Sequence, residues 1–98
     1  NSIVVYIADS GNFRIVKWAT GAATGVVVAG GNGSGLNLNQ INSPVSLFVD
    51  DSLSVYLSDM DNNRVMKWTS GATSGSIVAG GNGSGSALNQ FKWPTGLD

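Results

Sequence analysis

The chain has 98 residues, of which 42% are hydrophobic and 11% are charged, a balance that argues against a disordered chain. Its formal net charge is −1, and no window reaches the roughly 18 apolar residues of a membrane-spanning helix, so we expect neither a nucleic acid nor a membrane as partner. The sequence contains no Cys and no His, which excludes disulfides, zinc sites held by those residues and His-based catalytic triads.

Short strands separated by turn residues are predicted along the chain, with no helix. Ser2 to Ala8 (SIVVYIA) is rich in Val and Ile and ends at turn-forming Asp9 to Asn12, which is typical of a strand. Its continuous apolarity predicts burial on both faces. Arg14 to Trp18 is expected to complete an antiparallel hairpin, and Val26 to Ala29 adds a third strand.

A Gly- and Asn-rich connector, Gly30 to Pro44, follows and recurs from Gly80 to Pro94, which is 50 residues later. Without a gap, residues 1–48 align on residues 51–98 with 24 identical pairs, so the single domain 1–98 consists of repeat 1 (1–50) and repeat 2 (51–98). The remaining predicted strands are Val45 to Asp50, Val55 to Ser58, Arg64 to Trp68, Ser76 to Ala79 and Thr95 to Asp98.

Four short antiparallel strands per period match one blade of a β-propeller, so the predicted fold class is all-β. A complete blade is expected over residues 45–79. Residues 2–29 would supply three strands of a second, split blade, and residues 95–98 would supply the innermost strand of such a blade. A β-sandwich or a prism-like barrel tolerates this strand spacing but does not require so regular a repeat.

Several motifs recur in the same order in both repeats. The more complete set begins just before repeat 2 and consists of Pro44 to Asp50 (PVSLFVD), Val55 to Asp59 (VYLSD), Asn62, Arg64 and Val65 to Trp68. The matching residues of repeat 1 are Val5 to Asp9, Asn12 and Arg14. Pro94 to Leu97, which begin at the end of the second connector, match the start of the Pro44 motif. This pattern resembles the NHL-repeat β-propeller family over essentially the whole chain. The resemblance implies four-stranded blades arranged in a ring. Ser46 stands where the family has Gly, and the turn Asp51 to Ser54 lacks Gly.

The incomplete outer segments predict assembly with other copies of the chain. Thr95 to Asp98 of one copy is expected to pair beside Ser2 to Ala8 of the next, with Val4, Tyr6 and Leu97 at the interface. Three chains would give the favoured six-bladed ring and four chains an eight-bladed ring. Two alternatives stay open: a fragment of a longer propeller, whose further blades lie in the same chain, and an engineered or excised two-blade segment.

The candidate ligand-binding residues lie on the face formed by the connectors and the Asp9 to Arg14 turns. They are Trp93, Lys92, Arg14 and Arg64. Trp93 replaces Ser43 of the first connector and could stack on a sugar or a peptide side chain, or pack on a neighbouring connector. The GNGSG runs lack the Lys and the helix of a phosphate-binding loop, so we interpret their glycines as turn residues.

Four further polar residues are expected to stabilise turns: Asp9, Asn12, Asp59 and Asn62. Each Asp is expected to accept turn amide hydrogens beside the Arg five residues later. Their spacing does not reproduce a calcium loop, so no metal and no cofactor is predicted.

No residue is predicted to be catalytic. The leading hypothesis is therefore a non-catalytic binding or scaffolding module with a protein or peptide ligand. The alternative is a lectin-like propeller that binds glycans between blades, and a third hypothesis, an enzyme, would depend on Asp9 or Asp59.

Overall fold

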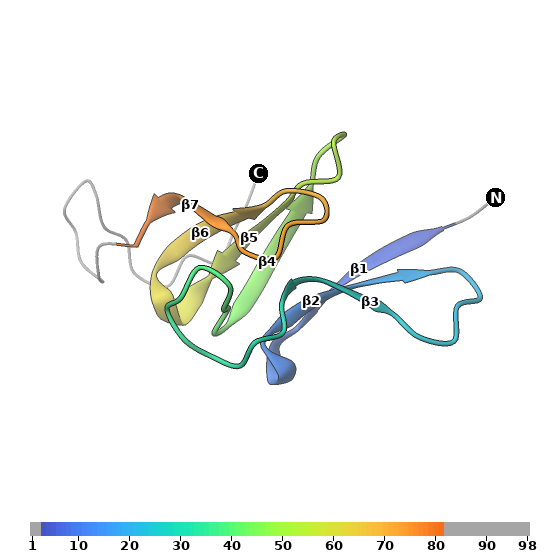
Figure 1. The fold of residues 1–98 in the computed structure, drawn as a ribbon, viewed down its shortest axis with the longest axis horizontal. Coiled ribbons are helices and arrows are strands. Elements are labelled where there is room, and N and C mark those ends of the chain that lie inside the picture. Colours follow the sequence, from blue (N-terminus) through green and yellow to red (C-terminus); the bar gives the residue numbers. More distant parts are fainter. Residues whose placement is uncertain (1–2, 82–98) are drawn as a thin grey trace.

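A computed structural model describes residues 3–81, without the side chain of Asp61. Within this range the chain forms two antiparallel sheets, sheet 1 with strand order β1-β2-β3 and sheet 2 with strand order β4-β5-β6-β7 (Figure 1). The strands are β1 (Val4–Asp9), β2 (Arg14–Ala19), β3 (Val26–Gly30), β4 (Pro44–Val49), β5 (Val55–Asp59), β6 (Arg64–Trp68) and β7 (Ser76–Gly80). The all-β prediction is confirmed, and the predicted strand Thr95 to Asp98 lies outside the described residues.

The two repeats contain matching hairpins, formed by β1 and β2 in repeat 1 and by β5 and β6 in repeat 2. A single 3-10 turn, η1 (Ser10–Asn12) or η2 (Met60–Asn62), joins β1 to β2 and β5 to β6. The residue after each turn has a positive φ, 56° at Phe13 and 51° at Asn63, which reverses the chain within a few residues. As a result Asp9 pairs with Arg14 and Asp59 pairs with Arg64 across the strands.

The core lies between the two sheets, and each sheet contributes one face to it. Alternation of side chains places the sheet 1 residues Tyr6, Ala8, Ile15 and Ala29 on the face that packs against sheet 2. Sheet 2 contributes Leu47, Val55, Leu57, Met66 and Trp68 to the core. Two sheets that pack face to face in this way bury one apolar face each and leave the other face free.

The outer face of sheet 1 is largely exposed apart from the buried Val16, although its sequence matches the buried face of sheet 2. Ile7 is 43% exposed and Trp18 is 39% exposed, whereas the matching Leu57 and Trp68 are 0% and 1% exposed. The prediction that the first strand is buried on both faces is therefore wrong for β1. The reason is that no sheet within residues 3–81 covers the outer face of sheet 1.

The first connector (residues 30–44) links the sheets and crosses the ends of β5 and β6. Figure 1 shows it as the teal to green segment that leaves β3, loops past the lower ends of these strands and enters β4. Ile41 on this connector is fully buried in the core cluster, and its side chain fills the space beside Gly30. The connector is thus part of the packed structure and fixes how repeat 1 meets repeat 2.

The unequal burial of matching residues predicts unequal costs of truncation. Leu57→Ala should lower the free energy of unfolding by about 2–5 kcal/mol, because it removes a fully buried side chain from the core. Ile7→Ala, at the matching position of repeat 1, should cost clearly less in urea unfolding of the monomeric chain. Equal losses for the two variants would contradict the observed difference in burial.

Candidate functional site

The second polar turn, which we define as Asp59, Asn62 and Arg64, is the most buried polar cluster of the described residues. Asp59 Oδ2 accepts from Arg64 Nε at 3.1 Å and from Asn62 Nδ2 at 2.8 Å. The side chains of Arg64 and Asp59 are only 1% and 0% exposed. Because η2 and Asn63 reverse the chain tightly, the three side chains converge on one point at the end of the β5-β6 hairpin.

The first connector supplies the remaining partners of this cluster. Arg64 donates from Nη1 to the carbonyl of Leu36 at 2.8 Å and from Nη2 to the carbonyls of Gln40 at 2.9 Å and Asn37 at 3.4 Å. In return, Asp59 Oδ1 accepts the backbone amides of Asn42 and Ser43, both at 3.0 Å. Asn62 Nδ2 also donates to the carbonyl of Gly35 at 2.7 Å.

Two side chains of the connector hold it in the shape that these contacts need. Asn32 Nδ2 donates to the carbonyl of Asn39 at 2.8 Å, and Gln40 Nε2 donates to the carbonyl of Asn32 at 3.0 Å. The amide of Asn37 donates to Gln40 Oε1 at 3.3 Å. A Cβ at Gly35 would collide with the end of the Gln40 side chain, so a larger residue there would displace Gln40 from these bonds.

Full hydrogen bonding explains how a charged pair can be buried here. Removing an Asp and an Arg from water is costly, and the cost is offset only when attraction between them and further hydrogen bonds replace the lost hydration. Among residues 3–81, no buried side-chain nitrogen or oxygen lacks a hydrogen-bond partner. The second polar turn therefore acts as a clamp that ties the connector of repeat 1 to the hairpin of repeat 2.

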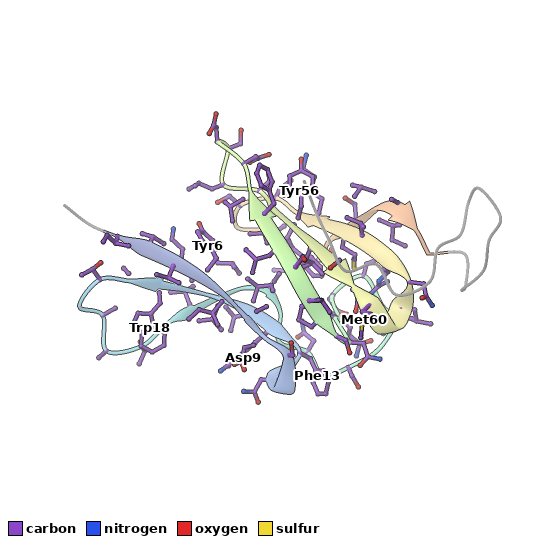
Figure 2. The ribbon with its side chains drawn as sticks, turned by 180° about the vertical axis from the view of Figure 1, so that it is seen from behind. Tyr6, Asp9, Phe13, Trp18, Tyr56 and Met60 are labelled. Atoms are coloured by element: carbon purple, nitrogen blue, oxygen red, sulfur yellow. The ribbon has the colours of Figure 1, made fainter. Side chains whose placement is uncertain are left out.

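The first polar turn, Asp9, Asn12 and Arg14, has the same internal geometry, but no connector within residues 3–81 covers it. Asp9 Oδ2 accepts from Arg14 Nε at 2.8 Å and from Asn12 Nδ2 at 3.0 Å. The side chains of Arg14 and Asp9 are 38% and 31% exposed. Hydrogen bonds from Asn12 and then from Arg14 lower the pKa of Asp9 below its ordinary value. In Figure 2, Asp9, Phe13 and Met60 lie along the lower edge of the molecule.

Two sheet faces are also uncovered within the described residues. Open face A, on sheet 1, consists of Val5, Ile7, Trp18 and Val27, which are 39% to 50% exposed. Open face B, on the far side of sheet 2, consists of Phe48, which is 50% exposed, and the half-buried Tyr56, Val65 and Lys67, with the buried Ser58 among them. On this face Phe48 and Tyr56 have ring centroids 6.2 Å apart, and Lys67 Nζ lies 5.4 Å from the centre of the Tyr56 ring.

A groove of about 1060 Å³ separates the outer parts of the two sheets. One wall is β3, and the other combines connector residues 37–39 with the turn at residues 71–74. Amide and hydroxyl groups line it beside small apolar side chains; the polar lining residues include Asn32, Asn37, Asn39, Thr24, Thr73 and Ser74. The groove can therefore offer both hydrogen bonds and apolar contacts to a small ligand.

The candidate residues of the sequence do not converge on one pocket. Arg64 is buried under the connector, whereas Arg14 is half-buried at the first polar turn. Val4 is exposed, and Tyr6 packs against the core with Lys17 Nζ lying 5.9 Å from the centre of its ring. Lys92, Trp93 and Leu97 lie outside the described residues.

Sequence reasoning missed the connector partners of the second polar turn. Asp59 was expected to accept amides of its own turn and Arg64 to lie along the sheet, but both reach backbone groups of the connector. Every residue has a backbone carbonyl, so the sequence does not show which carbonyls Arg64 binds. The only sequence signal for this contact is that the connector recurs at a constant distance from each Asp-x-x-Asn-x-Arg motif.

No protein-family model matches this sequence, and no curated protein matches it either. Residues 3–81 contain no helix long and apolar enough to cross a membrane. The described side chains include no group of three or more Asp, Glu, His or Cys residues placed to hold a metal ion.

The difference between the two polar turns predicts a large difference in stability between matched Arg variants. Arg64→Leu should lower the free energy of unfolding by about 3–5 kcal/mol, because it leaves the buried Asp59 without its counterion. Arg14→Leu should cost clearly less, because water can solvate Asp9. Urea unfolding of both variants measures this; a larger loss for Arg14→Leu would contradict the clamp.

The first polar turn also predicts an acid-dependent contribution to stability. The folded pKa of Asp9 lies below its unfolded value, so ionised Asp9 stabilises the fold above the ordinary carboxyl pKa. This stabilisation is lost as the pH falls through the lowered pKa.

Asn12→Ala should raise the pKa of Asp9 towards its ordinary value, as followed by NMR of the Asp9 carboxyl carbon. Ser10→Ala is the control, because Ser10 Oγ donates to the carbonyl of Pro44 rather than to Asp9. A similar rise in both variants would contradict the assigned role of Asn12.

Proposed function

We propose that the chain is a non-catalytic scaffold and binding module that assembles head to tail into a closed β-propeller of the NHL-repeat type. The observation that carries this proposal is the match between its two uncovered sheet faces. Open face A matches, through the repeat, the face of sheet 2 that is buried in the core. Open face B matches the face of sheet 1 that packs against that buried face.

The match can be followed position by position through the repeat of 50 residues. In open face A, Val5, Ile7 and Trp18 correspond to the buried Val55, Leu57 and Trp68. In open face B, Tyr56, Val65 and Lys67 correspond to Tyr6, Ile15 and Lys17 of sheet 1. Open face B of one copy can therefore cover open face A of the next by the packing that already joins the two sheets.

Such a contact is heterologous, because two different surfaces meet. Repetition of a heterologous contact gives a ring when the rotation between copies closes. The two sheets of one chain would then contribute two blades, so three copies would make six blades and four copies eight. In the ring, Thr95 to Asp98 would stand beside β1 as the fourth strand of the three-stranded sheet 1.

A second source of the same contacts is further repeats of a longer chain. In that arrangement the two open faces would be covered by blades of the same polypeptide, and the chain would be a blade-forming segment without an activity of its own. The surfaces involved are identical in both cases, so the solution mass of the chain separates them.

The assembly predicts a mass of three or four times the monomer mass of 10.0 kDa in sedimentation or mass photometry. Ile7→Lys in open face A and Phe48→Lys in open face B should each reduce the mass to that of the monomer, because each buries an unpaired charge at the contact. Leu36→Lys is the matched control, since Leu36 is 68% exposed on the connector, outside both faces. A stable monomer of the unmodified chain would refute the assembly.

The groove between the sheets favours a second candidate, a lectin-like module. Its asparagine amides and hydroxyl groups can bond to sugar hydroxyls, while its apolar wall can contact a sugar ring. A glycan array probed with the unmodified chain should then show a selective signal that Asn39→Ala weakens. Binding no stronger than that of an unrelated protein would remove this candidate.

A further inference from the structure

We infer that the first polar turn is a half-built clamp that binds the second connector, residues 80–94, of another copy of the chain. Asp9, Asn12 and Arg14 would be the receiving side chains, and the backbone of the second connector would supply the groups that they bind. This inference rests on the proposed head-to-tail assembly and names the polar contact within it.

The filled clamp of repeat 2 provides the template. There the connector gives Arg64 three carbonyl acceptors, gives Asp59 two amide donors and gives Asn62 one further carbonyl. Each of these six connector groups belongs to the backbone. The clamp therefore recognises the path of a connector and not its side chains.

The first polar turn already has the internal arrangement of the second polar turn. The Arg Nε to Asp Oδ2 distance is 2.8 Å in repeat 1 and 3.1 Å in repeat 2, and each Asn donates to the same carboxylate oxygen. Among residues 3–81, Arg14 donates only to Asp9, so its terminal nitrogens are free to bind further carbonyls. Asp9 Oδ1 is likewise open to two amide donors.

The second connector retains the residues that shape the first. Asn82 and Gln90 stand at the positions of Asn32 and Gln40, whose side chains hold the loop, and Gly85 stands at the position of Gly35. Lys92 and Trp93 replace Asn42 and Ser43, but the clamp needs only the backbone amides at these positions. The sequence differences therefore do not remove any group that the clamp binds.

Other ligands fit the first polar turn less well. A free anion would meet Arg14 but also the ionised Asp9 at 2.8 Å from it, so the local charge is balanced. A free cation would be attracted by Asp9 but repelled by Arg14 beside it. A segment that presents several carbonyls on one side and two amides on the other satisfies both charges, and this is what a connector presents.

The experiment titrates a synthetic peptide of residues 80–94 into the isotope-labelled full chain and follows the backbone amides by NMR. The chain carries Ile7→Lys, so that no other copy occupies the clamp. We expect shifts centred on residues 9–14. A peptide of the same composition in scrambled order serves as the control and should leave these amides unchanged.

Asp9→Ala and Arg14→Leu should each lower the affinity for the peptide about tenfold or more, because each removes charge-assisted hydrogen bonds. Both side chains are partly exposed, so these variants should keep the fold, which the unchanged spectrum of sheet 2 verifies. Lys17→Ala is the matched control outside the clamp.

The outcomes separate this inference from the proposed function. Shifts at residues 9–14 that disappear in both clamp variants support it, whatever the mass of the unmodified chain. No shifts, shifts confined to other residues, or equal affinity in the clamp variants overturn it, even if the chain forms a ring through its sheet faces.

Discussion

The buried pair of Asp59 and Arg64 is the interaction on which the arrangement of the two sheets depends. Its charges can leave water only because the first connector supplies amides to the carboxylate and carbonyls to the guanidinium. The connector in turn carries Ile41 into the core, so polar and apolar contacts require the same path of the chain. The position of sheet 2 against sheet 1 is thereby tied to a single loop conformation.

Comparing the two repeats separates the effect of local sequence on structure from the effect of the neighbouring sheet on burial. Trp18 and Trp68 lie at the same register position of matching strands, yet one is 39% exposed and the other 1% exposed. Asp9 and Asp59 form the same bonds within their turns, yet only Asp59 is buried. Local sequence therefore determines the hairpin, and the adjacent sheet determines whether its side chains become core.

This division explains what the sequence could predict. Strand positions followed from short runs rich in β-branched residues and from the turn residues that close them, because both signals act over a few residues. The exposure of β1 could not be predicted from its apolar residues, because burial depends on a sheet that must come from elsewhere. The partners of Arg64 were also hidden, since carbonyls such as those of Leu36 and Gln40 are present at every residue and only the folded path selects them.

Recognition through the backbone leaves the side chains of the first connector few constraints from the second polar turn. Leu36 and Asn37 become Ser86 and Ala87 in the second connector, and in the first connector Arg64 binds only their carbonyls. The identical positions include Asn32 and Gln40, whose side chains shape the first connector, and Gly35, where a Cβ would displace the Gln40 side chain. In the first connector, a variable side chain such as Leu36 is therefore left exposed while its carbonyl binds Arg64, so one residue can hold the loop in place and still present its side chain to solvent.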